Sequence, residues 1–290
     1  MSSNKFYYSA GEKEEKIKIV KLVLSIILVA LLVFTCVYTI IYVRSLEKEH
    51  TIQTETASSQ FLDVNVLICV EDKENKDVKP QFLLAGFDGE AKVITFCEIP
   101  DSLQLNAQDK SGTALKLFEY GSARYLRDAI QNHFGITVRR FISCSLSEVE
   151  VFVDKLGGLD YEVEEQMQYE NSEGSLVTNL VKGKQKLNGN QYCQYIRYDN
   201  WDSDSQKREK REALCVALLN EYAKTLDCDS IISIYKSVSN NLDTDASIVE
   251  VNDFGLKFGD FSEVEAPAVS AQVDFSDEAD AKAQIQKIYK

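Results

Sequence analysis

The stretch YIRYDNWDSDSQKREKREAL, residues 195–214, has the composition of an anion-binding site. Its acidic first half contains the only tryptophan of the chain, Trp201, and its second half opens a predicted helix with two lysines and two arginines. The N-terminus of a helix is already positive because its peptide dipoles align and its first N–H groups are unpaired. Four cations at that position therefore need an explanation.

Arg208 and Arg211 lie on one predicted helical face, which continues with apolar residues at i+7, i+10 and i+14, namely Cys215, Leu218 and Tyr222. The apolar part of the face indicates that it points toward the domain. Two guanidinium groups beside a helix N-terminus form a pocket suited to phosphate or pyrophosphate. The alternative is a solvated helix start, supported by an i, i+4 pair between Arg208 and Glu212.

Arg197 favours the anion-binding interpretation. Residues 191–198 have the composition of a buried strand, so Arg197 is expected at the end of that strand, two residues before Asp199. Ligands of α/β folds bind at the ends of strands, where helices begin. The sequence therefore predicts that Arg197, Arg208 and Arg211 share one phosphate site.

The overall composition restricts the partners. The chain has 290 residues and a formal net charge of −14, with apolar content sufficient for a core. Binding to a nucleic-acid backbone needs a broad basic surface, which this composition excludes. An anion site in this protein must therefore be local.

Residues 22–43 carry no charge and are long enough to cross a hydrocarbon layer of roughly 30 Å. Lysines dominate the charges just before this run, so the positive-inside rule places residues 1–21 in the cytosol. A cleaved signal peptide is the alternative, but the run is long and lacks a small-residue cleavage site. We expect a single transmembrane helix, a linker at residues 44–60, and a domain on the extracytoplasmic side of the cell membrane.

The seven cysteines are interpreted as buried thiols. Four of them lie in apolar, strand-like runs and one on an apolar helix face: Cys69, Cys97, Cys144, Cys193 and Cys215. The chain has no CxxC pair and only two histidines, which argues against a structural zinc site.

Strands and helices alternate along the rest of the chain. The apolar pattern predicts strands at residues 64–70, 82–87, 92–99 and 137–144, and helices at 122–134, 145–157, 203–226 and 276–289. Residues 164–180 are expected to form a long polar loop. Near-continuous apolar strands indicate an α/β fold, a mixed sheet sandwiched by helices on both faces.

Four segments, in order, resemble blocks of the LytR–CpsA–Psr family of cell-envelope proteins. They are VNVLICVEDKE, KVITFCEIPDSL, FISCSLSEVEVFVDKLGGLDYEV, and LVKGKQKLNGNQYCQYIRYD followed by REKRE. The resemblance spans residues 61–260, which makes residues 261–290 a C-terminal extension. The family's blocks contain an acid after the first strand, an Ile-Pro-Arg-Asp turn and an arginine-bearing helix.

The resemblance implies a function. Family members are single-pass, outward-facing proteins that move a glycopolymer from a polyprenyl-pyrophosphate carrier onto peptidoglycan with a divalent metal, taken here as Mg²⁺. Carried over, Arg197, Arg208 and Arg211 would bind the phosphates. Asp72, in the place of the acid after the first strand, would act as the catalytic or metal-binding residue. The implied partners are the membrane, the lipid-linked glycopolymer and peptidoglycan, with no nucleic acid.

The chain departs from the family pattern at four charged positions, where three arginines and one acid are missing. The Arg-Ser-Asp motif falls on residues 78–80, and the arginines of two other motifs are replaced by Asp101 and Asp199. Loss of one charge-stabilising donor commonly slows such chemistry about a hundredfold to a thousandfold. Glycopolymer transfer is therefore doubtful unless other cations substitute, for which the candidates are Lys79, Arg124 and Arg127. A catalytically degenerate lipid-binding, scaffolding or regulatory protein is the alternative.

Trp201 has two possible roles. An aromatic ring beside acids in a loop could stack on a sugar ring, or it could anchor the loop to the domain.

Overall fold

The computed structural model describes residues 64–107, 109–225, 228–251, 264 and 266–289. These residues belong to one compact unit, Phe61–Lys290. The predicted cytosolic segment, transmembrane helix and linker, residues 1–60, lie outside the described residues. Within the described ranges, the structure contains no helix of the length and hydropathy needed to span a membrane.

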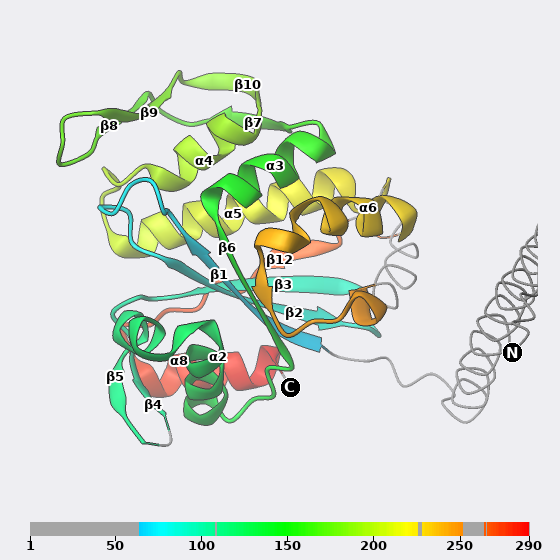
Figure 1. The fold of residues 1–290 in the computed structure, drawn as a ribbon. Coiled ribbons are helices and arrows are strands. Elements are labelled where there is room, and N and C mark those ends of the chain that lie inside the picture. Colours follow the sequence, from blue (N-terminus) through cyan, green and yellow to red (C-terminus); the bar gives the residue numbers. More distant parts are fainter. Residues whose placement is uncertain (1–63, 108, 226–227, 252–263, 265, 290) are drawn as a thin grey trace, which may run out of the picture. The chain divides into compact units, whose positions relative to one another are not determined.

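A six-stranded mixed sheet forms the centre of the domain (Figure 1). Its spatial order is β11 (Asp243–Thr244), β6 (Arg140–Ser145), β1 (Val64–Glu71), β2 (Gln81–Asp88), β3 (Val93–Ile99) and β12 (Ala268–Ser270). β1 is parallel to β6, β3 is parallel to β12, and β2 is antiparallel to both β1 and β3. The carboxyl ends of β1, β3 and β6 therefore lie at the same edge of the sheet.

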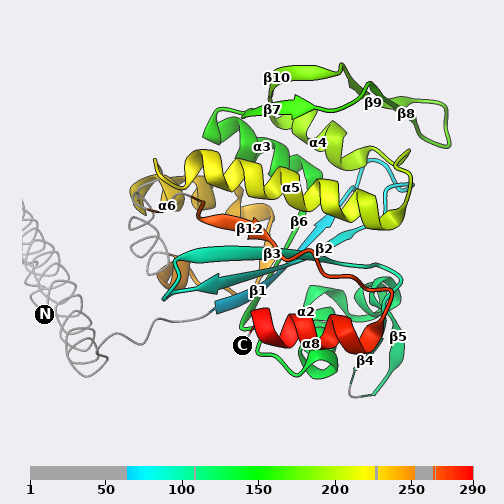
Figure 2. The same cartoon turned by 180° about the vertical axis from the view of Figure 1, so that it is seen from behind.

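Helices cover both faces of this sheet (Figures 1 and 2). One face carries α2 (Ala114–Phe134) and α8 (Glu278–Ile288). The other carries α3 (Leu146–Leu156), α4 (Gly189–Arg197), α5 (Asp204–Tyr222) and α6 (Cys228–Val238). The predicted mixed α/β fold is thus confirmed for the described part of the chain.

Apolar side chains fill the space on each side of the sheet. Between the sheet and α2, the core contains Leu67, Phe82, Leu126, Phe141 and Ile285. A second cluster joins α3, α4 and α5 through Leu146, Val153, Tyr195, Ile196 and Leu214. Full burial of such a side chain contributes about 1.5–3 kcal/mol, so these clusters fix the helices against the sheet.

Two predicted elements were wrong. Residues 191–198 form most of α4 rather than a strand, because Asn188 and Gln191 make a capping box: Gln191 N donates to Asn188 Oδ1 at 2.9 Å and Asn188 N donates to Gln191 Oε1 at 3.1 Å. The predicted loop 164–180 contains the hairpin of β8 (Met167–Glu170) and β9 (Leu176–Leu180). Buried Met167 and Leu180 anchor this hairpin among polar neighbours.

Two further two-stranded sheets flank the central sheet. β4 (Gln104–Asn106) pairs with β5 (Ser111–Thr113), and β7 (Leu159–Val163) pairs with β10 (Gly183–Leu187), both antiparallel. A short 3-10 helix, η1 (Ser239–Asn241), leads into β11.

The segment expected as a C-terminal extension contributes to the core. β12 extends the central sheet beside β3, and α8 packs on α2. The buried Tyr289, just after α8, donates its hydroxyl group to the carbonyls of Leu84 and Thr95, each at 3.3 Å. These contacts make the segment part of the domain.

Five cysteines whose side chains the structure describes are free thiols. Cys69, Cys97, Cys144 and Cys193 are buried and Cys215 is half-buried. Burial raises the pKa of all five thiols, so they behave as small apolar side chains.

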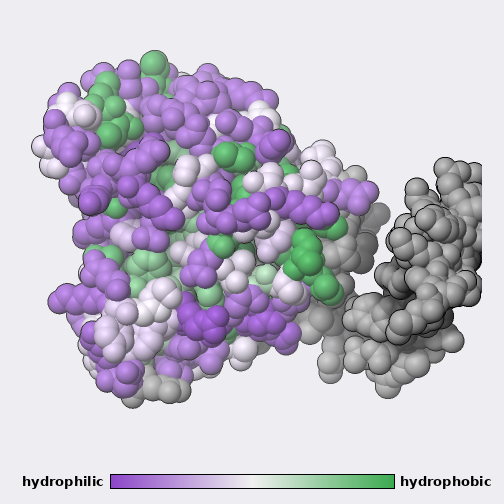
Figure 3. Space-filling model, viewed as in Figure 1, coloured by the Kyte–Doolittle hydropathy of each residue, from purple (hydrophilic) through white to green (hydrophobic). Residues whose placement is uncertain are grey.

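The face of the domain shown in Figure 3 is mostly hydrophilic, and its apolar residues appear as separate areas. The exposed large apolar side chains belong to different elements, among them Val151 of α3 and Leu176 of β9. Hydropathy alone therefore singles out no ligand surface on this face.

Candidate functional site

Four charged residues meet where β1 and β3 end. Asp72 follows β1, Glu98 is the last residue but one of β3, Arg197 ends α4, and Arg211 lies in α5. We call these four residues the strand-end cluster. The structure thus pairs the predicted phosphate ligand Arg197 with the predicted acid Asp72, and it joins Arg211 to the neighbouring residue Ile196.

Asp72 and Arg197 form a buried ion pair. Arg197 Nε donates to Asp72 Oδ2 at 2.7 Å, with the side chains 13% and 1% exposed. The other carboxylate oxygen, Oδ1, accepts from the backbone N–H groups of Glu74 at 3.1 Å and Asn75 at 3.0 Å. Burial lowers the pKa of Arg197, but the hydrogen bond and charge of Asp72 outweigh it and raise that pKa. Arg197 therefore stays charged.

Arg211 is held equally firmly. Its Nε and Nη2 donate to the carbonyl of Ile196 at 3.1 and 2.7 Å, and its Nη1 donates to Glu98 Oε1 at 3.2 Å. The side chains of Arg211 and Glu98 are each only 7% exposed. Gln81, the first residue of β2, lies against this pair, and with its amide oxygen toward Arg211 it accepts from Nε at 2.9 Å.

A second buried glutamate adjoins the pair. Glu212 Oε1 accepts from the backbone N–H of Glu98 at 2.7 Å, and Oε2 accepts from the Ser270 hydroxyl. Burial raises the pKa of Glu98 despite the opposing charge of Arg211, and burial also raises the pKa of Glu212. The sequence analysis missed Glu98, although an acid inside an apolar strand is a signal of a buried, paired charge.

Arg208 differs from these arginines. It is half-buried, and its guanidinium carbon lies 5.8 Å from the centre of the Phe275 ring. No carboxylate in the described part of the chain forms an ion pair with it. Its positive charge acts on Glu98 and Glu212, so it lies near the strand-end cluster. Arg208 is therefore available to an anion without the breaking of an ion pair.

The remaining cations at the start of α5 have local partners. Lys207 pairs with Asp199, and Lys210 pairs with Glu164 at 2.5 Å. The N-terminus is capped by Ser203, whose hydroxyl accepts from Gln206 N at 3.1 Å. The basic helix start is thus partly explained by pairing with acids from neighbouring loops.

Lysines neutralise both acids that replace family arginines. Lys79 Nζ lies 2.8 Å from Asp101 Oδ2, and this hydrogen bond raises the pKa of Lys79. Asp199 is neutralised by Lys207. Of the three candidate substitutes, Lys79 is the one that contacts a position of the family motifs.

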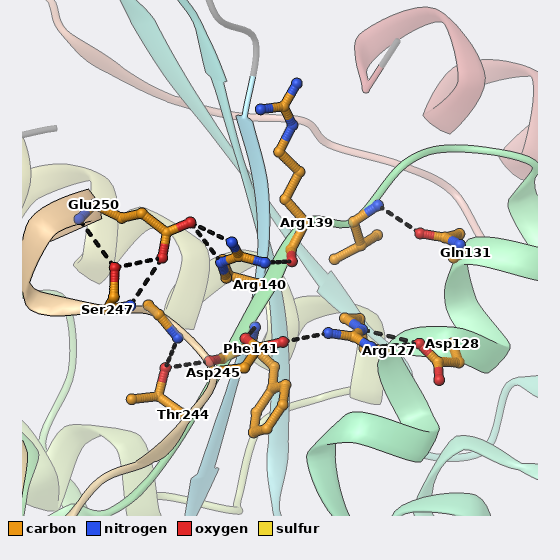
Figure 4. Close-up of polar contacts among 12 residues, drawn as sticks. Arg127, Asp128, Gln131, Arg139, Arg140, Phe141, Thr244, Asp245, Ser247 and Glu250 are labelled. Carbon is orange, nitrogen blue, oxygen red and sulfur yellow. Dashed lines mark hydrogen bonds and ion pairs between the residues drawn. The ribbon is translucent and has the colours of Figure 1, made fainter. Parts of the chain in front are cut away.

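Arg127 lies at the opposite end of the sheet, where β6 begins (Figure 4), and Arg124, three residues earlier in α2, also lies over Phe141 of β6. Both guanidinium groups lie 5.6 Å from the Phe141 ring, and Arg127 Nη1 donates to Asp245 Oδ2 at 2.5 Å. Arg140 Nε donates to Glu250 Oε1 at 2.9 Å. We call Arg127, Arg140, Asp245 and Glu250 the strand-start cluster.

The two clusters are separated by the length of a strand. Arg140 pairs in register with Val66, whereas Asp72 lies six residues further along, just beyond Glu71. At about 3.3 Å per residue, this places them roughly 20 Å apart. The structure therefore does not bring Arg124 or Arg127 to the predicted phosphate site.

The residues around Asp72 do not fit a ready-made metal site. Both carboxylate oxygens are occupied by N–H donors, and within the described ranges no group of three or more Asp, Glu, His or Cys side chains is arranged to hold an ion. Mg²⁺ in proteins needs a free carboxylate edge, usually completed by substrate phosphates and water. Asp72 offers no such edge while Arg197 is bound.

Trp201 anchors its loop. Its ring packs edge-on against Tyr198, with 5.0 Å between centroids, and lies 5.8 Å from Tyr195. It also lines a polar cavity of about 230 Å³ together with Glu164, Glu165, Asn200, Asp202 and Gln206. This packing supports the anchoring role, and stacking on a sugar stays a prediction.

Comparison with protein families gives one match over most of the chain: the LytR_cpsA_psr family, at residues 41–288. A curated relative from Enterococcus faecalis, polyisoprenyl-teichoic acid–peptidoglycan teichoic acid transferase TagU, is 22% identical over 57% of this chain and 51% of its own length. The uncharacterized protein SAOUHSC_00997 from Staphylococcus aureus is 27% identical over 42% of this chain and 31% of its own length. The chain thus matches about half or less of these relatives.

Solved structures share the fold. Bacillus subtilis TagV aligns with a TM-score of 0.62 at 14% identity, covering 80% of this chain and 98% of TagV. A putative transcription regulator from Eubacterium siraeum aligns at 0.68 and 12% identity, covering 80% and 92%. TagT bound to LIIa-WTA aligns at 0.55 and 18% identity, covering 72% and 77%. At these sequence identities, the structural similarity shows that the chain shares the fold of these proteins.

Proposed function

The chain belongs to the LytR–CpsA–Psr family, and on this premise we propose that it is a cell-envelope protein that binds a glycopolymer on a polyprenyl-phosphate or -pyrophosphate carrier. The proposal includes a membrane anchor at residues 22–43 and a domain on the extracytoplasmic side. It is supported by the teichoic acid transferase TagU among the relatives and by TagT bound to LIIa-WTA among the structures of the same fold.

One observation carries the proposal: Arg208, a cation without an ion pair in the described ranges, lies one helical turn from Arg211 at the edge of the strand-end cluster. Arginine binds phosphate through two parallel N–H···O contacts. Arg197 and Arg211 add positive charge behind it. The carboxylates of Glu98 and Glu212 accept hydrogen bonds from the Arg211 guanidinium, the Glu98 backbone N–H and the Ser270 hydroxyl, and these donors offset part of the negative charge near an arriving phosphate.

Arg197 and Arg211 have a second role in this proposal. Their guanidinium groups already hold the anionic oxygens of Asp72 and Glu98, at 2.7 and 3.2 Å. A phosphate bound at Arg197 Nε or Arg211 Nη1 would have to displace the carboxylate that each of these atoms holds. We therefore assign direct contact to Arg208 and electrostatic support to the other two arginines. No step is assigned to Mg²⁺, because Asp72 lacks a free carboxylate edge.

Transfer of the glycopolymer to peptidoglycan is the second candidate, favoured by the name of the TagU relative. It would require Asp72 to release Arg197 before it could orient an acceptor hydroxyl. We propose binding with little or no transfer. Incubation of the full chain with Mg²⁺, a lipid-linked saccharide and peptidoglycan tests this choice. Strong transfer that is lost in Asp72→Ala would contradict it.

The lipid that copurifies with the protein tests the proposed ligand class. The full chain and its Arg208→Ala variant are purified from membranes in the same detergent, and bound lipid is extracted and identified by mass spectrometry. We expect polyprenyl phosphates enriched with the unmodified chain and reduced several-fold in the variant. Lys236→Ala, a substitution in α6 away from the cluster, serves as the control. Equal lipid content in all three preparations would refute the proposal.

A further inference from the structure

Asn75 holds a buried donor beside the strand-end cluster. The residue is 7% exposed, and its side-chain nitrogen, Nδ2, has no acceptor in the described part of the chain. The other polar groups of Asn75 are bonded: its backbone N–H donates to Asp72 Oδ1 at 3.0 Å, and its Oδ1 accepts from Asp77 N at 3.3 Å. Nδ2 therefore lacks a hydrogen-bond partner in the described part of the chain, whereas the other polar atom of the Asn75 side chain and its backbone N–H are bonded.

Unpaired buried donors are uncommon because they lose their bonds to water and gain none in return. The turn that holds Asn75 is fixed at both sides, which limits its ability to move Nδ2 to another acceptor. Asp72 accepts from two of its N–H groups, and Asp77 Oδ2 accepts from Ser172 N at 2.6 Å in the β8–β9 connection. A fixed, unpaired donor is suited to a ligand atom that accepts hydrogen bonds.

The neighbourhood indicates the class of that atom. Asn75 is connected to Arg197 through a single side chain, Asp72, which bonds both. The Asn75 turn and Arg197 thus share one carboxylate partner, and donors grouped in this way favour an anionic oxygen over a neutral one. We propose that Asn75 Nδ2 donates a hydrogen bond to a phosphate oxygen of the bound ligand. This inference rests on the proposed function.

Two substitutions separate a ligand contact from a structural role. Asn75→Ala removes the unpaired donor and the weak acceptor bond to Asp77 N. Asn75→Asp keeps an acceptor for Asp77 N but replaces the donor with an anionic oxygen. If Asn75 has only a structural role, Asp is a better replacement than Ala, because Asp can still accept the hydrogen bond from Asp77 N. If Asn75 Nδ2 donates a hydrogen bond to phosphate, Asp is a worse replacement than Ala, because its anionic oxygen repels the ligand.

The experiment is calorimetric titration of the full chain in detergent micelles with farnesyl pyrophosphate, a short polyprenyl pyrophosphate, combined with thermal unfolding of each variant. We expect Asn75→Ala to weaken binding about tenfold, equivalent to about 1.4 kcal/mol, while its Tm is unchanged or higher. Asn75→Asp is expected to bind at least as weakly as Asn75→Ala.

Two results would overturn the inference alone: unchanged binding by Asn75→Ala, or a lowered Tm and weakened binding in Asn75→Ala that Asn75→Asp restores. Arg208→Ala is titrated in parallel. If the unmodified chain shows no saturable binding, or if Arg208→Ala binds as tightly as the unmodified chain, the proposed function fails, and the inference fails with it.

Discussion

The strand-end and strand-start clusters each contain two arginine–carboxylate pairs, but water reaches them to different extents. In the strand-end cluster, every paired side chain is at most 13% exposed. In the strand-start cluster, exposure rises from 16% at Arg127 to 43% at Glu250. The same residue types therefore form a sealed network at one end of the sheet and a partly solvated one at the other.

This difference determines what each ion pair contributes. A buried charge that loses its partner remains in a medium that solvates it poorly, so breaking a buried pair is costly. An exposed charge is solvated by water when its partner is removed, so breaking an exposed pair costs little. The strand-end cluster should thus be sensitive to single substitutions, and the Arg140–Glu250 pair of the strand-start cluster should tolerate them.

The largest effect is expected for Arg211→Ala. This substitution leaves Glu98 buried without its cation, which should lower the free energy of unfolding by about 3–5 kcal/mol. Chemical denaturation followed by the fluorescence of Trp201, the only tryptophan, measures this value.

A double variant controls for the loss of packing. Arg211→Ala combined with Glu98→Gln removes the unpaired charge as well, and we expect it to recover at least half of the lost stability. A loss below about 1 kcal/mol in the single variant would show that the strand-end cluster is not sealed from water.

The pH dependence of stability should have opposite signs in the two clusters. The pKa of Glu98 is raised in the folded protein, so its contribution is full below its usual pKa and is lost as the pH rises through the raised value. The pKa of Glu250 is lowered from 4.5 to about 2 by its bond from Arg140, so its contribution is present above 4.5 and is lost as the pH falls through about 2.

Unfolding free energies measured from pH 3 to pH 8 check these signs. Glu98→Gln should flatten the decline on the alkaline side. Glu250→Gln should flatten the decline on the acidic side, by about 1 kcal/mol after screening by water. If either variant retained the slope of the unmodified chain, the assignment of that slope would be wrong.

The smallest effect is expected for Arg140→Ala. Its pair with Glu250 is 38% and 43% exposed, so its removal should lower the free energy of unfolding by about 0.2–1 kcal/mol. Arg139→Ala is the matched control, because Arg139 is exposed and its side chain points away from Glu250 (Figure 4). A cost above about 2 kcal/mol for Arg140→Ala would remove the contrast between the clusters.

Much of the fold could be predicted from the sequence because its signals are local. The apolar runs fixed β1, β2, β3 and β6 to within a few residues, and α3 and α5 begin at caps formed by Ser145 and Ser203. α4 was missed because the aromatic and β-branched residues around Tyr195 are typical of strands. Its identity depended on the capping box at Asn188, three residues before Gln191.

The candidate site was predictable only in part. Asp72 was identified from the family motifs and Arg197 from its place shortly before the basic helix start, and they form one pair. Arg211, in α5, has side-chain partners on two strands of the central sheet: Gln81 on β2 and Glu98 on β3. Such contacts depend on strand register and helix packing, which composition and spacing do not encode. For the same reason Arg127 could not be distinguished from a phosphate ligand before its bond to Asp245 was known.

The central claim, that phosphate binds at the strand-end cluster and not at the strand-start cluster, is tested most directly by hydrogen–deuterium exchange of the full chain with and without farnesyl pyrophosphate. We predict slower exchange at residues 72–78 and 204–212 when the ligand is bound, and no change at residues 243–251. Protection at residues 243–251, or no protection at either end of the sheet under saturating ligand, would contradict the claim.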